Sequence, residues 1–283
     1  MFQEGFALKI LLVSPILTSE YDSGKYILKA FCELGHYVHV WDYRLQPDKR
    51  NFPECDLVLV NKGESIDPDI FKSLGVSVVN WYPDQLSRFD VRDKLKKYDK
   101  VYSINKPEPG YEWVEWLPGA YDEDVHRDVG IERKVDCMYI GTCNSSRKVD
   151  YIKTINPNLI FGNEWDNFGI EAFPPVYGAK FTWVANHAKI LVNIHQAEWG
   201  TNRKLFELIP CGFTLTDLVP GVEDIFGELA DIIAFRTPEG GREMVKYYLE
   251  DEDERNKVWE MEKKIVKEYS YKNQIQKILK EVM

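Results

Sequence analysis

The sequence predicts a protein of two facing α/β domains, each built on a doubly wound parallel sheet. Short apolar runs alternate with helix-like segments along most of the chain, which is typical of such sheets. The chain has 283 residues and is 44% hydrophobic, enough for two separate cores. A polar segment without sustained periodicity divides the halves. We therefore expect an N-terminal domain at 1–118, a linker at 119–134, a second domain at 135–258 and a terminal helical segment at 259–283.

In the first half, buried strands that mostly alternate with helices are expected after an ill-ordered lead-in, residues 1–7. The strands are expected at 9–14, 37–42, 57–61, 76–81 and 100–104. The helices are expected at 23–34, 69–74 and 91–98. The loop after the first strand holds one glycine and no GxGxxG pattern, so a dinucleotide fingerprint is absent.

Two carboxylates that follow strands of this half are candidate catalytic bases. Asp84 follows Pro83 in the run WYPDQ, so it is expected to project from the sheet edge into the cleft between the domains. A Pro-Asp turn explains the same residues equally well. Asp22, beside Ser23, is the second candidate, although either residue is also a typical helix N-cap.

The second half repeats the alternation and ends in amphipathic helices. Strands are expected at 137–141, 159–162, 190–194, 213–217 and 232–235. Helices are expected from the 142–148 loop to about 155, at 180–188, 202–211 and 222–227, and through the tail 239–283. The tail has one buried stripe at helical spacing, too short in its repeats for an independent coiled coil.

Composition excludes several classes of protein. The net charge of −10 opposes nonspecific binding to polyanions such as DNA or an anionic membrane. No apolar run is long enough to span a bilayer and no secretion signal is evident, so a cytoplasmic location is expected. The 5 cysteines form no CxxC pair, so we interpret them as core residues of a protein in a reducing compartment. Asp122, Glu123 and Asp124 lie in the expected linker, where a solvated acidic loop is the natural explanation, so no metal site is expected.

The stretch 189–217 carries the most informative charges. A helix is expected to start at Asn202, with Arg203 and Glu207 one turn apart and directed away from the core. Unpaired N–H groups at a helix start favour a diphosphate, a guanidinium suits phosphate, and a carboxylate can accept hydrogen bonds from a ribose diol. A nucleotide sugar fits this arrangement, with Lys204 beside Arg203. A solvated i,i+4 ion pair is the alternative.

The run NRKLFELIPCGFTLTD, with VEDIFGELADIIAF and a charged helical tail behind it, resembles the C-terminal domain of GT-B glycosyltransferases. It looks most like the spore-maturation CgeB-type group, and the likeness covers residues 189–275. The resemblance implies two Rossmann-like domains, a final helix that crosses back to the first domain, and nucleotide-sugar binding by Arg203 and Glu207.

Other candidate contacts to the donor lie at neighbouring strand ends. Gly141, Thr142 and Arg147 belong to a loop that could cradle phosphate, although such loops are often plain connectors. In the resembled fold the strand ending at Gly162 borders the nucleotide base, which makes Trp165 a stacking candidate, with core packing as its rival role. His195 ends a strand where it could contact the donor sugar, or it is structural.

The sequence therefore favours a metal-independent glycosyltransferase that moves a sugar from a nucleotide diphosphate, most simply UDP, to an unidentified hydroxyl of a glycan, small molecule, protein or modified DNA base. An inverting enzyme would use Asp84 or Asp22 as its base. The Glu-x7-Glu spacing of many retaining relatives would require Glu at position 199, which is Trp199, and Glu198 is one residue away. Stereochemistry and oligomeric state stay open. A catalytically silent nucleotide-sugar scaffold, a nucleotide-sugar epimerase and a phage-type DNA glucosyltransferase are the alternatives.

Overall fold

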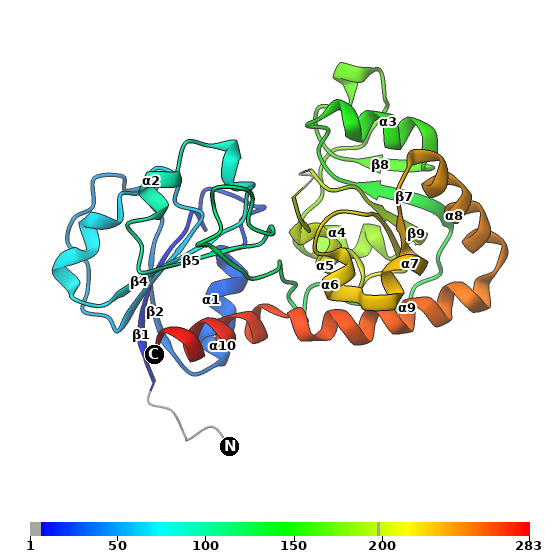
Figure 1. The fold of residues 1–283 in the computed structure, drawn as a ribbon. Coiled ribbons are helices and arrows are strands. Elements are labelled where there is room, and N and C mark those ends of the chain that lie inside the picture. The colour runs from blue at the N-terminus through cyan, green and yellow to red at the C-terminus, as the bar shows by residue number, and fades with distance from the viewer. Residues whose placement is uncertain (1–6, 197–198) are drawn as a thin grey trace. The chain divides into compact units, whose positions relative to one another are not determined.

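The computed structural model describes residues 7–196 and 199–283, which divide into two compact units. Unit 1 comprises Met1–Pro118 and Tyr271–Met283, and unit 2 comprises Gly119–Ser270 (Figure 1). Each unit is built on a parallel sheet with helices on its faces, as the alternation in the sequence predicts. Within the described residues, no helix is both long enough and apolar enough to cross a membrane.

The sheet of unit 1 has the strand order β2-β1-β3-β4-β5-β6. The strands are β1 Lys9–Val13, β2 Tyr37–Trp41, β3 Leu57–Asn61, β4 Ser77–Tyr82, β5 Lys100–Ser103 and β6 Glu115–Trp116. The α-helices are α1 Gly24–Glu33, α2 Arg92–Leu95 and the returning α10 Tyr271–Val282, and a 3-10 helix spans Pro68–Leu74. The strand order reverses between β1 and β3, so the carboxyl ends of these two strands form the topological switch point, where ligands of such sheets bind.

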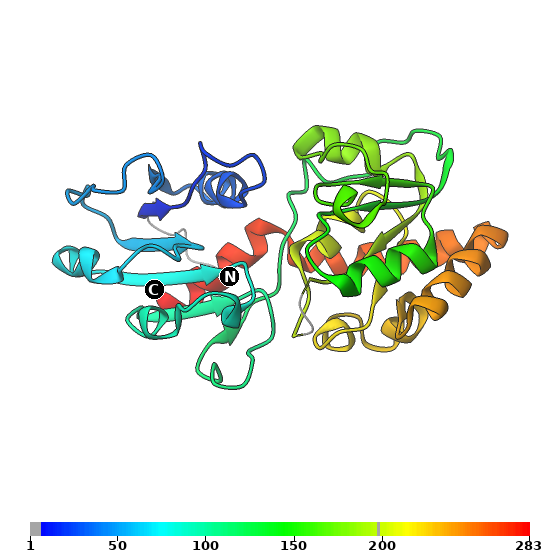
Figure 2. The ribbon, with the colours of Figure 1, turned by 90° about the horizontal axis from the view of Figure 1, so that it is seen from above.

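The returning helix α10 packs beside α1 in unit 1 (Figures 1 and 2). The Tyr271 ring stacks on Tyr26 with centroids 5.4 Å apart, and Ile275 and Ile278 are fully buried. Gln274 Nε2 donates to the backbone oxygen of Pro118 at 2.8 Å. The last helix is therefore a core element of unit 1.

The sheet of unit 2 has the order β11-β10-β9-β7-β8. Its strands are β7 Val135–Ile140, β8 Leu159–Phe161, β9 Ala188–Asn193, β10 Thr214–Asp217 and β11 Ala234–Phe235. Its helices are α3 Ser146–Ile155, α4 Gly178–Ala185, α5 Arg203–Leu208, α6 Val222–Phe226, α7 Ala230–Ile233, α8 Pro238–Glu250 and α9 Glu252–Val266. The helices α3 and α8 pack side by side (Figure 2), and α4 packs on β9. The switch point lies between β7 and β9.

The first half of the expected strand at 232–235 is helical, and only the second half is a strand. Ala230 and Ile233 are buried at an i,i+3 spacing in α7, whereas Ile232 is exposed, so the burial follows a helical period and only Ala234–Phe235 extends the sheet. The neighbouring apolar residues are too few for the sequence to distinguish a strand from one helical turn.

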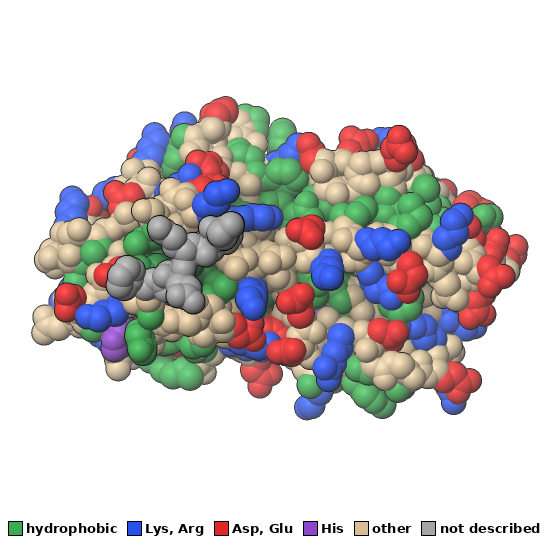
Figure 3. Space-filling model, turned by 90° about the horizontal axis from the view of Figure 1, so that it is seen from below, with side chains coloured by type: hydrophobic (Ala, Val, Ile, Leu, Met, Phe, Trp, Pro, Cys, Tyr) green, Lys and Arg blue, Asp and Glu red, His purple; other side chains and the backbone are tan. Residues whose placement is uncertain are grey.

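The helix α9 belongs to unit 2, although residues 259–283 were expected to pack as one segment on the first domain. Trp259 Nε1 donates to the oxygen of Ile209 at 2.7 Å, and Glu262 Oε2 accepts from the Thr214 N–H at 3.1 Å. The outer side of α9 carries i,i+3 ion pairs such as Lys263–Glu260. Accordingly, basic and acidic side chains are interspersed on the face in Figure 3.

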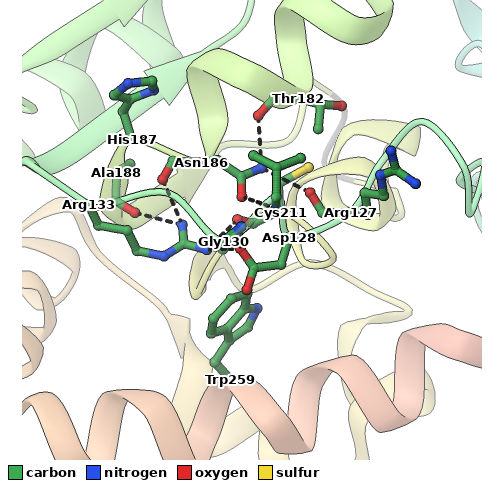
Figure 4. Close-up of polar contacts among 12 residues, drawn as sticks. Arg127, Asp128, Gly130, Arg133, Thr182, Asn186, His187, Ala188, Cys211 and Trp259 are labelled. Atoms are coloured by element: carbon green, nitrogen blue, oxygen red, sulfur yellow. Dashed lines mark hydrogen bonds and ion pairs between the residues drawn. The ribbon is translucent and has the colours of Figure 1, made fainter.

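The segment 119–134, expected as a linker, is fastened within unit 2 by Arg133 (Figure 4). Its guanidinium donates to the backbone oxygens of Asn186 at 3.3 Å, Ala188 at 3.0 Å and Cys211 at 2.8 Å. It also lies over the Trp259 ring, 4.6 Å from the centroid. One side chain thus joins the segment to β9, to the end of α5 and to α9.

Two side chains near α4 hold the same segment from the other side (Figure 4). Asn186 Nδ2 donates to the oxygen of Arg127 at 2.9 Å, and its Oδ1 accepts from the Val129 N–H at 2.8 Å. Thr182 Oγ1 donates to the oxygen of Val125 at 2.7 Å. The backbone of the segment therefore has fixed partners in unit 2.

Replacing Arg133 by Met is expected to lower the free energy of unfolding by about 3 kcal/mol, because three backbone oxygens lose their donor. Urea denaturation measures the change. The control is Arg242→Met, whose side chain is 46% exposed, with an expected effect within about 0.5 kcal/mol. Equal unfolding midpoints for the two variants would contradict the fastening role.

Candidate functional site

The candidate site lies at the carboxyl edge of the unit 2 sheet. Because the strands are parallel, the residues that follow β7, β9 and β10 meet at this edge. The helices α3 and α5 begin there, and each brings two consecutive basic residues in its first turn: Arg147 and Lys148 from α3, Arg203 and Lys204 from α5. This edge therefore gathers four cations.

The helix α5 brings Arg203, Lys204 and Glu207 together. Asn202 is its N-cap, and its side chain accepts from the Leu205 N–H at 3.0 Å. Arg203 Nε lies 2.8 Å from Glu207 Oε1, and Lys204 Nζ lies 3.2 Å from Glu207 Oε2. The expected pairing of Arg203 with Glu207 is present. Glu207 is only 3% exposed, however, so the prediction that its side chain is directed away from the core was wrong. The alternative expectation, a solvated i,i+4 ion pair on the surface, does not match this buried carboxylate.

The electrostatics of Glu207 are set by its two cations. Burial by itself would raise the pKa of this carboxyl, but Arg203 and Lys204 outweigh burial and hold the pKa at about 2. Burial lowers the pKa of Lys204, and the nearby Arg203 adds to this effect. The carboxylate is thus ionised, and it fixes both cations at the sheet edge.

His126, which our reading of the sequence missed, lies next to Glu207. It is 2% exposed, and its Nε2 is 3.8 Å from Glu207 Oε1. Burial lowers the pKa of His126 to about 4, with a further contribution from Lys204 and Arg203, so the ring is neutral at pH 7. No sequence signal links it to Glu207, because it lies in the polar segment expected as a linker.

A second cation–carboxylate set joins Arg147, Asp217 and His195. Arg147 Nη2 lies 2.6 Å from Asp217 Oδ2, and Arg147 Nη1 donates to the His195 backbone oxygen at 3.2 Å. Asp217 Oδ1 accepts from the His195 N–H at 2.8 Å and lies 2.7 Å from His195 Nδ1. His195 is completely buried, and its Nε2 lies 3.3 Å from Asn193 Nδ2. This burial and these contacts favour the structural interpretation of His195.

Lys148 adds a cation between these two sets. Its ammonium donates to the Thr142 oxygen at 3.3 Å, and the residue is 6% exposed. Burial lowers the pKa of Lys148 to about 8, Asp217 opposes this, and the positive charges of Lys204 and Arg147 contribute to the lowering. A buried ammonium that faces two other cations is a position suited to an anion.

The loop after β7 is shaped by close contacts. A Cβ at Gly162 would lie 2.1 Å from the Gly141 oxygen, and its φ of +150° also favours glycine. Trp165 Nε1 donates to that oxygen at 2.8 Å, and its ring packs edge-on against Tyr139. Trp165 is 1% exposed, so it supports the loop as a core residue and presents no free face to a base.

The two candidate bases lie at the carboxyl edge of the unit 1 sheet. Asp22 is 8% exposed, and its Oδ1 accepts from Ser14 Oγ at 2.7 Å, from the Gly24 N–H at 2.7 Å and from Asn61 Nδ2 at 3.2 Å. It is thus held inside the switch point between β1 and β3 and at the start of α1. Because three donors already occupy one oxygen, Asp22 is well placed to order the loop.

Asp84 is more accessible than Asp22. It is paired with Lys62 at 3.0 Å and with Arg88 at 3.5 Å, and its side chain is 20% exposed. Lys62 and Arg88 also lie over the half-exposed Phe89 ring. The side chain therefore keeps a solvent-facing part while two cations orient it.

Among residues 7–196 and 199–283, no group of three or more His, Cys, Asp or Glu side chains is arranged to hold a metal ion. The 122–124 acidic run instead orders a turn, since Asp122 Oδ1 accepts from the N–H groups of Asp124 and Val125.

The stability of the protein is expected to fall as pH drops from about 6.5 to 4. In this window an unfolded His126 with an ordinary pKa binds a proton, whereas the folded His126, with its pKa lowered to about 4, does not. The shift corresponds to about 3 kcal/mol at most. Glu207, with its pKa held at about 2, adds a further loss as pH falls below 4.5. Urea denaturation across pH 4–7 measures this dependence, which should be weaker in His126→Gln and unchanged in the exposed control His39→Gln.

Part of the chain that includes this edge resembles a known family. The family model described as glycosyl transferase-like matches residues 147–280, which contain both cation–carboxylate sets. No curated protein sequence matches the chain.

Solved structures match nearly the whole chain. A T4 phage β-glucosyltransferase mutant in complex with UDP-glucose is 13% identical, with a TM-score of 0.67 over 97% of this chain and 99% of that one. Anabaena HepE in complex with UDP and glucose is 12% identical, with a TM-score of 0.67 over 97% and 99%. A glycosyltransferase from Rickettsia africae is 11% identical, with a TM-score of 0.66 over 98% of each chain. The chain therefore shares the GT-B fold of these structures, and its residues 147–280 match the glycosyl transferase-like model.

Proposed function

We propose that this protein transfers a sugar from a UDP-sugar to an acceptor hydroxyl, with no need for a metal ion. The observation that supports it best is the charge balance of the unit 2 edge. Among the described residues, four cations at this edge, Arg147, Lys148, Arg203 and Lys204, lie near two carboxylates, Asp217 and Glu207, so positive charge predominates in this group of side chains. Each phosphate of a sugar-linked diphosphate is negatively charged, so this ligand would balance the excess.

The choice of uridine is supported by relatives of the same fold. The T4 phage and Anabaena structures contain UDP-glucose or UDP, and we extend this donor class to the present chain. The NRKLFE run is the feature that supports the finer assignment to the CgeB-type group.

In the proposed donor site, Glu207 accepts hydrogen bonds from the ribose diol while Arg203 and Lys204 turn toward the diphosphate. The helix α5 has six residues and Asn202 already caps its first turn, so side-chain cations rather than the helix dipole dominate the binding. Gly141 and Thr142 belong to the neighbouring loop after β7, Gly162 packs against it, and the buried Lys148 ammonium donates to its Thr142 oxygen.

In the proposed reaction, Asp84 accepts the proton of the acceptor hydroxyl as its oxygen attacks the anomeric carbon. The bond from that carbon to the diphosphate breaks, and UDP leaves with its new charge stabilised by the cations of unit 2. Asp84 is preferred to Asp22 because it is more accessible and Asp22 is held by three donors.

The donor site is tested by UDP binding, measured by calorimetry. The wild type is expected to bind UDP and UDP-glucose equally well with EDTA or Mn²⁺ present. Lys204→Met is expected to weaken binding about tenfold to a hundredfold, because a charge-assisted contact to phosphate is lost. The control is Lys153→Met, an exposed residue of the last turn of α3. Failure of the wild type to bind UDP would disprove the proposal.

The base is tested by Asp84→Asn, which keeps the shape of the side chain. Its rate of sugar transfer is expected to fall by about a hundredfold or more, with UDP affinity unchanged. Transfer is measured with UDP-glucose against pools of glycans, small alcohols and hydroxymethylated DNA. Donor binding by the wild type without turnover in any pool would favour the scaffold alternative instead.

A further inference from the structure

The turn formed by residues 119–126 lies against the residues of the proposed donor site. It begins at Gly119, where unit 2 begins. A Cβ at Gly119 would come 2.8 Å from Arg203 Cα and 3.2 Å from Phe206 Cδ2. Only glycine allows the backbone of this turn to approach the start of α5 so closely.

The other end of the turn places His126 beside Glu207. His126 Nδ1 accepts a hydrogen bond from the Asp122 N–H at 3.0 Å, so in the neutral ring the proton is on Nε2. That Nε2–H lies 3.8 Å from Glu207 Oε1, the oxygen that Arg203 Nε contacts at 2.8 Å. The ring is further held edge-on against Phe181, with centroids 5.7 Å apart.

The turn is closed by its own groups and is held by the 3-10 helix Lys267–Tyr269. Asp122 Oδ1 accepts from the N–H groups of Asp124 and Val125 at 3.1 and 3.0 Å. Tyr121 N–H donates to the oxygen of Tyr269 at 3.2 Å. The Tyr269 ring also packs on Phe206 of α5, with centroids 5.2 Å apart.

We infer that the 119–126 turn is a positioning element of the donor site, with Gly119 setting the position of the Arg203 backbone and His126 supporting the Glu207 carboxylate. This inference rests on the proposed function. When Arg203 turns from Glu207 toward a diphosphate, Glu207 Oε1 loses its closest donor. The Nε2 of His126 lies 3.8 Å from that oxygen, so a small shift of either side chain would let it replace the lost donor while the carboxylate binds the ribose.

Two substitutions at His126 test whether its Nε2–H supports the Glu207 carboxylate or whether the ring only closes the turn through Nδ1. The amide nitrogen of Gln can stand in for Nε2–H, whereas the amide oxygen of Asn can stand in for Nδ1. Calorimetry with UDP is expected to show near wild-type affinity for His126→Gln and about tenfold weaker binding for His126→Asn. Equal affinities, or weaker binding by His126→Gln, would overturn the inference.

A glycine pair tests the other end of the turn. Gly119→Ala is expected to weaken UDP binding about tenfold by displacing the start of α5. Gly240→Ala is the matched control, because a Cβ there meets nothing closer than 3.4 Å. Unchanged affinity in Gly119→Ala would overturn the inference. Absence of UDP binding by the wild type, in contrast, would overturn the proposed function itself, which keeps the two failures distinct.

Discussion

The buried Glu207 carboxylate between Arg203 and Lys204 is the interaction on which the candidate site depends. A carboxylate at 3% exposure would be strongly destabilising without both cations. The need to neutralise it therefore holds two basic side chains at the sheet edge before any ligand arrives. One carboxylate cannot balance two cations, so this set keeps a positive charge. The contacts that allow Glu207 to be buried therefore also favour the binding of an anion.

Most of the fold could be predicted from the sequence because its strands are buried on both faces. β1 and β3 are continuous apolar runs, which sequence reasoning recognises without any knowledge of partners. The errors fall where a distant contact decides the structure. The polarity of residues 119–134 indicates a linker, yet Arg133 donates to the backbone oxygens of Asn186, Ala188 and Cys211, which are 53 to 78 positions away in the sequence.

The candidate site was predictable only where its residues are neighbours in sequence. The pairing of Arg203 with Glu207 follows from their i,i+4 spacing, and Lys204 follows from adjacency. The depth of Glu207 did not follow, because burial depends on what packs over the helix. His126 and Lys148 were missed for the same reason, since their partners come from other elements. Trp165 was proposed at the correct strand end, but its indole supports the Gly141 loop from within the core.

Both cation–carboxylate sets of unit 2 share one design. Asp217 and Glu207 are almost completely buried, whereas the side chains of Arg147 and Arg203 are 26% and 24% exposed. In each set the carboxylate contacts the guanidinium, and part of the arginine side chain stays exposed to solvent. Arginine suits this task because its planar group presents donors in several directions at once. A lysine presents all its donors from one nitrogen, whereas an arginine spreads them over a plane, so each buried carboxylate holds a cation that is already partly exposed at the sheet edge.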